Sequence, residues 1–117
     1  METLKSSGQF ERVRREGRTW ATPLVVLNAA PNSESIVRCG FITGKKVGKA
    51  VKRNRARRLL QEAVRLRLPL IKTGWDLVWI ARQAIVDASF EAVGKSVDEA
   101  LARGRLYASP HSATDGL

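Results

Sequence analysis

The segment from Lys49 to Leu68 constrains the fold of this 117-residue chain more than any other, because it predicts one long amphipathic helix. Its apolar residues recur at intervals of three and four, which is the spacing of a single helix face. At 1.5 Å per residue such a helix is about 30 Å long. Pro69 and Gly74 indicate where the helix ends and the next loop lies. The predicted buried face consists of Ala56, Leu59, Leu60, Ala63, Val64 and Leu68.

Three further segments predict β-strands. Leu24–Ala30 is apolar and rich in β-branched residues, and only a short turn separates it from a second strand at Ile36–Thr43. Because that link is short, we expect these two strands to pair antiparallel. Trp75–Arg82 is apolar on both faces, which is typical of a strand at the centre of a sheet. Trp20 is assigned to a short strand that precedes the others.

Two shorter helices complete the predicted order. The first spans residues 7–16, with Ser6 or Ser7 as its N-cap and Gly17 at its end. The second spans Ser89–Arg103, with Ser89 as its N-cap. The predicted buried side of that helix is Phe90, Val93, Val97, Ala100 and Leu101.

The resulting order, α-β-β-β-α-β-α, predicts a single-domain α+β fold. We expect a two-layer sandwich with one sheet over residues 1–108. The last segment, residues 109–117, is small and polar, and it is predicted to be a disordered tail.

The positive charge of the chain is concentrated in one segment. Lys and Arg number 21 against 11 Asp and Glu, which gives a formal net charge of +10. From Ser35 to Gln61 there are nine Lys and Arg and no acidic residue, and eight of the nine lie between Lys45 and Arg58. Protein surfaces normally mix charges of both signs. The segment therefore predicts a surface that binds nucleic-acid phosphates, and the alternative is a solvated basic helix face.

Composition excludes several classes of protein. Cys39 is the only cysteine and His111 the only histidine, so an internal disulfide and a Cys/His zinc site are both excluded. We expect Cys39 to lie in or beside the core. No apolar run approaches the roughly 18 residues of a membrane helix, and the N-terminal segment lacks the apolar core of a signal peptide. We therefore expect a cytoplasmic protein.

The start of the long helix is the candidate site. A helix N-terminus favours acidic residues, but the loop and first turns here carry only basic charge. Bound phosphate would compensate this arrangement, because free backbone N–H groups between glycines and ammonium groups both hold anions. The Arg-Asn-Arg run at 53–55 can also bind phosphates, ribose hydroxyls or base edges. The candidate RNA-binding residues are Lys45, Lys46, Lys49, Lys52, Arg53, Asn54, Arg55, Arg57 and Arg58.

The sequence offers no set of side chains for catalysis. It has no paired carboxylates on an identifiable face and no Cys–His pair. The loop from Gly44 to Lys49 lacks the spacing of a Walker nucleotide-binding loop. We therefore expect no catalytic residue in this chain and no metal ion bound by the protein alone.

Several motifs together resemble the protein subunit of bacterial ribonuclease P. They are Gly-Lys-Lys-Val-Gly-Lys-Ala-Val at 44–51, Arg-Asn-Arg at 53–55 and Arg-Arg-Leu-Leu-Gln-Glu-Ala at 57–63, and Gln9–Gly17 and Asp76–Arg82 also fit. The resemblance covers residues 8–105. It implies a left-handed crossover around the long helix and a one-to-one complex with a catalytic RNA. It also implies that this RNA, with magnesium ions that it mainly holds itself, removes the 5′ leader of precursor tRNA.

The same resemblance implies a cleft for the leader, between the first helix and the open face of the sheet. Bases would stack on Phe10, and neutralised phosphates would let the cleft hold a single strand with little sequence preference. Arg14 and Asn28 stand where the family often has aromatic residues, and Gly44 stands where it often has serine. The cleft is thus expected to be more polar and more cationic than usual. The implied cleft residues are Phe10, Val13, Arg14, Asn28, Lys45 and Lys49.

Two other functions stay open at this point. A ribosomal-type RNA-binding protein would share the basic segment but would need no leader cleft. A protein-only nuclease would need clustered carboxylates or histidines, which the sequence does not show. Aromatic residues can either pack in the core or stack on bases. Trp75 and Trp79 are expected in the core, whereas Phe10 could serve either purpose. Arg82 is expected to pair with an acidic neighbour such as Asp76.

Overall fold

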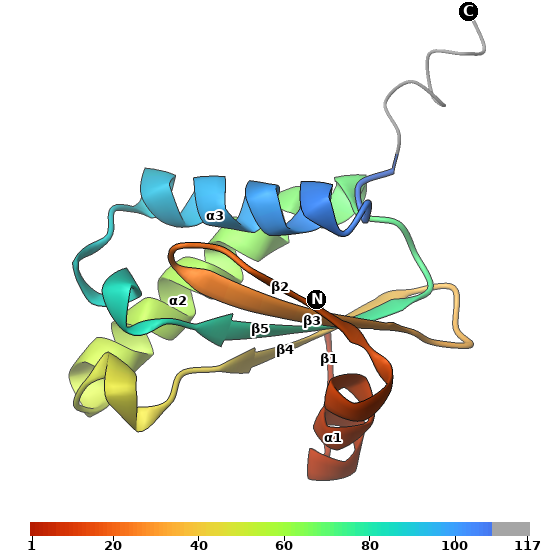
Figure 1. Cartoon of the computed structure of the whole chain (residues 1–117), viewed down its shortest axis with the longest axis horizontal. Coiled ribbons are helices and arrows are strands. Elements are labelled where there is room, and N and C mark those ends of the chain that lie inside the picture. The colour runs from red at the N-terminus through yellow and green to blue at the C-terminus, as the bar shows by residue number, and fades with distance from the viewer. Residues whose placement is uncertain (109–117) are drawn as a thin grey trace, which may run out of the picture.

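The computed structural model describes residues 1–108, which form a five-stranded sheet with helices on both of its faces (Figure 1). The predicted tail at 109–117, with His111, lies outside the described residues. In chain order the elements are β1 (Glu2–Thr3), α1 (Ser7–Glu16), β2 (Arg18–Ala21), β3 (Val25–Pro31), β4 (Val37–Ile42), α2 (Ala50–Arg67), β5 (Trp75–Ala81) and α3 (Phe90–Arg103). Short 3₁₀ turns lie at η1 (Lys45–Val47), η2 (Leu68–Leu70) and η3 (Gln83–Asp87).

The helix boundaries follow local capping signals. Ser6 caps α1 by accepting the Gln9 N–H (3.2 Å), and the Gln9 side chain accepts the Ser6 N–H in return. Ser89 caps α3 by accepting the Ala92 N–H (3.1 Å). Both caps were predicted, and so was the short strand that contains Trp20. The two-residue strand β1, which pairs in parallel with β4, was not predicted.

The strand order is β1-β4-β5-β3-β2, and this confirms β5 as a central strand. The predicted pairing of the strands at 24–30 and 36–43 was wrong. β3 and β4 do run in opposite directions, but β5 lies between them, antiparallel to β3 and parallel to β4. The loop after β3 passes over the start of β5, where Asn32 N–H donates to Gly74 O and Gly74 N–H donates to Ile36 O (both 2.8 Å). The short link between β3 and β4 therefore does not make these strands neighbours in the sheet. After β4 the chain returns through α2, and β5 takes the place between them.

The main core lies between the sheet and the layer of α2 and α3. Alternate residues of β5, including Trp75 and Trp79, face this layer, as predicted. Phe90 was expected on the buried side of α3, but it is 40% exposed. Phe90 is the first residue of α3 and precedes the buried stripe, which begins at Val93. In the middle of that stripe Ser96 is also buried, and its hydroxyl accepts the Leu24 N–H (3.3 Å). The largest fully buried side chains are Trp79, Leu27, Leu60, Leu77, Ile85 and Leu101.

A second, smaller core lies on the other face of the sheet, where α1 packs (Figure 1). It consists of Leu4, Val13, Ala30 and Val78. Because α1 is only ten residues long, it covers part of this face and leaves the rest open. None of the helices within residues 1–108 is both long enough and apolar enough to cross a membrane.

Cys39 lies in the main core, as predicted, and is completely buried. Burial raises the pKa of its thiol to about 12. The thiolate is the reactive form of cysteine. Cys39 in the folded chain is therefore protected from alkylation at neutral pH, and its modification reports unfolding.

Candidate RNA-binding surfaces

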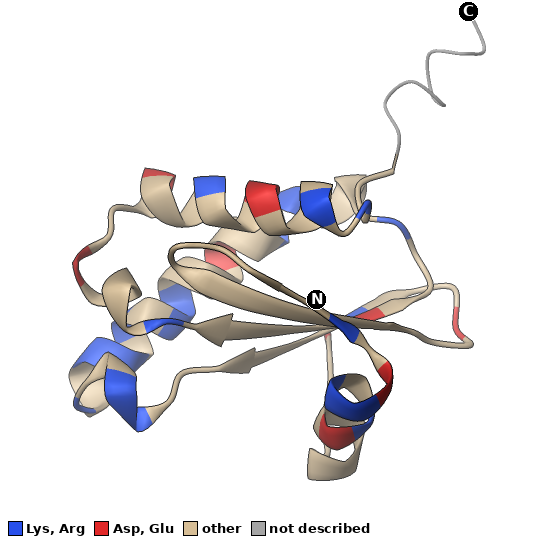
Figure 2. Ribbon diagram, in the orientation of Figure 1, with Lys and Arg blue, Asp and Glu red and all other residues tan. Residues whose placement is uncertain are grey.

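The predicted residues lie along η1 and the first half of α2, where the ribbon is largely basic (Figure 2), and we call this part of the chain's surface the basic surface. Most of these side chains are exposed, and Arg53 and Arg57 are half-buried. Arg57 is held by hydrogen bonds to Asn54 Oδ1 (3.3 Å) and Thr43 Oγ1 (3.1 Å). The basic surface is defined by the residues proposed from the sequence, Lys45, Lys46, Lys49, Lys52, Arg53, Asn54, Arg55, Arg57 and Arg58.

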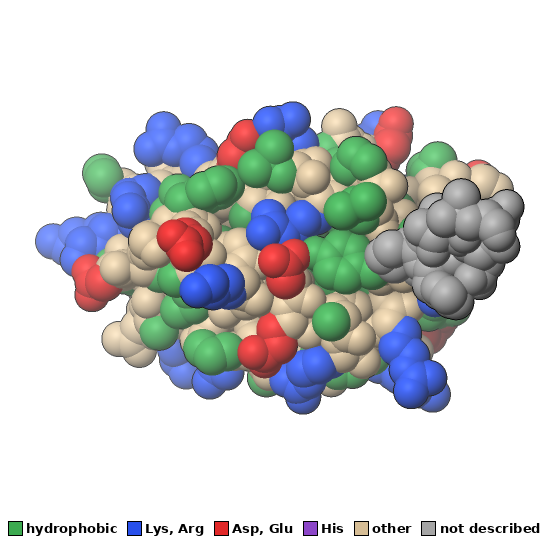
Figure 3. Space-filling view, turned by 90° about the horizontal axis from the view of Figure 1, so that it is seen from above, with side chains coloured by type: hydrophobic (Ala, Val, Ile, Leu, Met, Phe, Trp, Pro, Cys, Tyr) green, Lys and Arg blue, Asp and Glu red, His purple; other side chains and the backbone are tan. Residues whose placement is uncertain are grey.

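No ion pair within residues 1–108 involves the basic surface. Elsewhere arginines are commonly paired, as in Arg14–Glu11 on α1, Arg65–Glu62 late in α2 and Arg103–Glu99 on α3. On the face that α3 covers, basic, acidic and hydrophobic side chains are interspersed (Figure 3). The basic surface therefore keeps a charge that the described part of the chain does not neutralise, and a polyanion could supply the opposite charge.

The start of α2 adds backbone donors to these charges. Lys49 is the N-cap residue and makes no side-chain capping bond, and the first turn contains no acidic residue. The amide groups at this end of the helix therefore remain available to an anion. Gly48 turns the chain into the helix with φ = 132°, a backbone conformation that glycine adopts without strain. A hollow of about 600 Å³ lies here, and Lys46, Lys49, Lys52, Gln83 and Asp87 are among its lining residues.

A separate cleft of about 450 Å³ lies between α1 and the uncovered part of the sheet. Phe10 lines it and also packs closely, because its ring lies over Gly40, where a Cβ atom would come within 2.4 Å of the ring carbons. Phe10 therefore serves as both a packing residue and a cleft residue. The cleft is lined by Lys5, Ser6, Ser7, Phe10, Glu11, Arg14, Asn28, Ile42, Val78 and Ile80.

Three of the six predicted cleft residues do not line this cleft. Val13 is completely buried beneath α1, because it is the residue that anchors the helix in the smaller core. Lys45 and Lys49 belong to the basic surface, and Lys49 lines the other hollow at the start of α2. Phe10, Arg14 and Asn28 do line the cleft.

Arg14 and Asn28, which line the cleft, both make hydrogen bonds within the protein. Arg14 Nη2 donates to both carboxylate oxygens of Glu11, at 2.7 and 2.9 Å. The hydrogen bond from Arg14 lowers the pKa of Glu11, so this pair stays ionised. Asn28 is 7% exposed, and its Oδ1 accepts the Thr19 hydroxyl at 2.7 Å. Apart from these polar groups the lining of the cleft is mainly apolar, and the cleft is less cationic than Arg14 alone suggested.

Comparison with known proteins places the chain in a family. A family model of ribonuclease P matches residues 1–105. The ribonuclease P protein component of Roseiflexus sp. is 48% identical over 114 residues, covering 96% of this chain and 93% of that protein. The corresponding protein of Chloroflexus aggregans is 43% identical over 110 residues, covering 93% and 82%. The chain belongs to the ribonuclease P protein component family.

Solved structures of this family share the fold. The Staphylococcus aureus RNase P protein superposes with a TM-score of 0.84 at 25% identity, covering 92% of this chain and 99% of that one. The Thermotoga maritima RNase P protein gives 0.79 at 26% identity, covering 88% and 97%. The family and the fold together assign this chain the role of a ribonuclease P subunit.

Sequence reasoning missed several cleft residues of this ribonuclease P subunit. Val78 and Ile80 alternate along β5 with the buried tryptophans, so a strict period of two would have placed them on the opposite, open face. Glu11 precedes Arg14 by three residues, a spacing at which opposite charges meet on a helix. Ile42 had no such signal, because the pairing of β4 with β5 is not local.

Proposed function

We propose that this ribonuclease P subunit binds two RNA segments through two different surfaces. The basic surface binds the catalytic RNA, and the cleft beside α1 binds the 5′ leader of precursor tRNA. The assembly contains one protein per RNA and acts in the cytoplasm. The observation that carries the proposal is that, within residues 1–108, the basic surface makes no ion pair whereas other arginines are commonly paired.

The structure supports different roles for the two surfaces. The basic surface offers guanidinium and ammonium groups with backbone amides, which suit the phosphates of a folded RNA. The cleft offers Phe10 and the apolar side chains of Val78 and Ile80, which suit the bases of an unpaired strand. A ribosomal-type RNA-binding protein would use only the first surface, so the cleft and the family membership favour the ribonuclease P role.

In this proposal the RNA performs the hydrolysis with its own magnesium ions. Glu11, the carboxylate among the lining residues of the cleft, is bound to Arg14, and Asp76 on the same face of the sheet is bound to Arg38. A carboxylate in a bidentate arginine pair is a poor magnesium ligand and a poor general base, because its lone pairs are occupied. The chain therefore contributes binding and orientation, and it supplies no catalytic side chain.

Reconstitution tests this assignment. The purified chain alone should leave precursor tRNA intact, whereas the chain added to its catalytic RNA should restore leader removal at magnesium concentrations too low for the RNA alone. Cleavage products are separated on a denaturing gel. Magnesium-dependent cutting by RNA-free protein would show that the roles of protein and RNA are assigned wrongly.

The Glu11–Arg14 pair gives a second test, which addresses the cleft. Glu11→Gln should strengthen holoenzyme binding of a leader-bearing precursor by roughly twofold to fivefold at low salt, because Arg14 is released toward the leader phosphates. Both side chains are exposed, so the gain should vanish at high salt. The control is Glu91→Gln, which breaks a comparable pair with Lys95 on α3. Equal effects of the two variants, or no gain with Glu11→Gln, would remove Arg14 from the leader site.

A further inference from the structure

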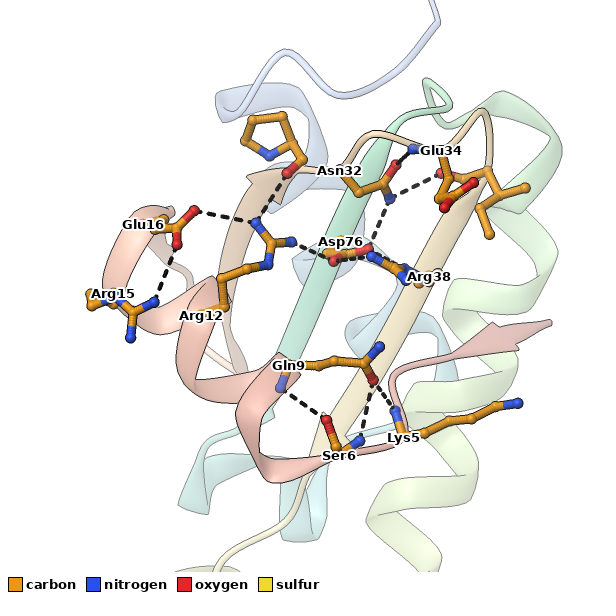
Figure 4. A network of polar contacts seen from close by, with 12 residues as sticks. Lys5, Ser6, Gln9, Arg12, Arg15, Glu16, Asn32, Glu34, Arg38 and Asp76 are labelled. Carbon is orange, nitrogen blue, oxygen red and sulfur yellow. Dashed lines mark hydrogen bonds and ion pairs between the residues drawn. The ribbon is translucent and has the colours of Figure 1, made fainter.

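Asp76 is a buried carboxylate on the face of the sheet that α1 covers (Figure 4). Its side chain is 0% exposed, and donors reach both of its oxygens. Oδ1 accepts from Arg38 Nε (2.7 Å) and Asn32 Nδ2 (2.8 Å), and Oδ2 accepts from Arg38 Nη2 (2.8 Å) and Arg12 Nη2 (2.6 Å). The expected partner, Arg82, instead donates to Thr22 O (2.9 Å). Asp76 therefore joins α1, β4, β5 and the loop after β3.

The bond from Arg12 differs in kind from the other contacts of α1. Val13 packs in the smaller core and Phe10 lies over Gly40, and both contacts are apolar. Apolar contacts have little directional preference, so they allow a short helix to roll or slide. The bond from Arg12 to Asp76 is directional, and Arg12 also donates to Pro31 O (3.3 Å). This ion pair therefore fixes the rotation of α1 over the sheet.

The rotation of α1 determines the shape of the cleft, because one wall of the cleft is α1 itself. Phe10 and Arg14, which line the cleft, flank Arg12 in the sequence. Asp76 has a second effect on the same face, since it occupies the guanidinium groups of Arg12 and Arg38, which are 30% and 23% exposed. Without Asp76 these two cations would be free to bind RNA phosphates at an unspecific site beside the cleft.

We propose that Asp76 is a positioning residue for leader recognition. It holds Arg12 and Arg38, and it thereby sets the position of α1, the width of the leader cleft and the absence of competing cations beside that cleft. The inference rests on the proposed function of the cleft. It assigns a role in RNA discrimination to a buried side chain that does not itself line the cleft.

The test uses holoenzyme reconstituted from the full chain and its catalytic RNA. The dissociation constants for precursor tRNA with its leader and for mature tRNA are measured, and their ratio is the preference for the leader. Asp76→Asn should reduce this preference by about fivefold to tenfold, the effect of one or two lost hydrogen bonds. Binding of mature tRNA and of the catalytic RNA should change by no more than about twofold. A loss of folded protein alone would raise both apparent dissociation constants by the same factor and leave their ratio unchanged.

Two further variants make the result decisive. Arg12→Gln removes the bonds from α1 to Asp76 and Pro31 O, together with the exposed pair to Glu16, and leaves Asp76 bonded to Arg38 and Asn32. It should therefore reduce the preference even where Asp76→Asn proves too unstable to assay. Asp98→Asn is the control for loss of an arginine-bound carboxylate away from α1. Asp98 lies on α3 and accepts two bonds from Arg67 (2.6 and 3.2 Å) and one from the Tyr107 hydroxyl.

The possible results separate this inference from the proposed function. If the unmodified holoenzyme shows no preference for the leader, the proposed function of the cleft is wrong. If it shows that preference and Arg12→Gln keeps it, or if Asp98→Asn loses it equally, the positioning role of Asp76 is overturned. Loss of preference in Arg12→Gln and retention in Asp98→Asn supports the inference.

Discussion

Replacing Arg53, Arg55 and Arg58 together with alanine is expected to weaken binding of the catalytic RNA by roughly 100-fold or more at about 0.1 M salt. Each phosphate contact contributes about 0.7–0.9 to the slope of log K against log salt, so three lost contacts should make the slope shallower by about 2–3. Fluorescence anisotropy of labelled RNA over a range of salt concentrations measures both quantities.

These three arginines are chosen because the fold does not depend on them. Arg53 and Arg58 make no side-chain hydrogen bond within residues 1–108, and Arg55 makes one exposed bond to Val86 O (3.2 Å). Arg57 is left unchanged, because its bonds to Asn54 and Thr43 hold the start of α2 against the end of β4. The variant should therefore keep the unfolding free energy of the parent protein within roughly 0.5 kcal/mol.

A charge-matched control separates local contacts from net charge. The residues of the control, Lys72, Lys95 and Arg103, lie outside the basic surface. Their joint replacement with alanine also removes three positive charges. This control should leave the salt slope nearly unchanged. Equal losses in the two triple variants would mean that the RNA responds to the net charge of the protein, and an unchanged slope in the first would mean that these arginines touch no phosphate.

Local features of this fold were predictable because their causes are local. Ser6, Gly17 and Ser89 mark helix ends through groups within a few residues, and the structure places the boundaries there. The pairing of β3 with β5 joins residues far apart in sequence, and no local signal selects it over a β3–β4 hairpin. The sheet order was therefore beyond a reading of turns and strand patterns.

In the candidate site, too, some residue positions have a local cause in the sequence and others depend on the fold. The basic surface was predictable, because a run of like charge on one helix remains together however the helix packs. Asp76 was assigned to the wrong arginine, because its partners Arg12 and Arg38 lie 64 and 38 residues away and meet it only through the fold. The resemblance placed Val13 in the cleft, but its complete burial follows from how α1 packs on the sheet.

Gly17→Ala is expected to destabilise the protein by about 3 kcal/mol, the upper part of the range for inserting a methyl group into a packed site. A Cβ atom at Gly17 would lie 2.5 Å from Ala29 O and 2.5 Å from Val13 O. Both neighbours are backbone atoms, so relief requires α1 or β3 to move. The reason is space and not backbone conformation, since φ at Gly17 is −88°. Urea unfolding measures the loss, and alkylation of Cys39 gives an independent signal.

Gly44→Ala is the control for this substitution, because no atom lies within 4 Å of a Cβ at Gly44 and its φ of −76° suits alanine. The Gly44→Ala variant should have the same unfolding free energy as the parent protein or a slightly higher one, since alanine restricts the unfolded chain more than glycine does. Equal stability of the two variants would show that the end of α1 is free to move away from β3. In that case the cleft wall would not be a fixed surface, and the positioning of α1 by Asp76 would lose its structural basis.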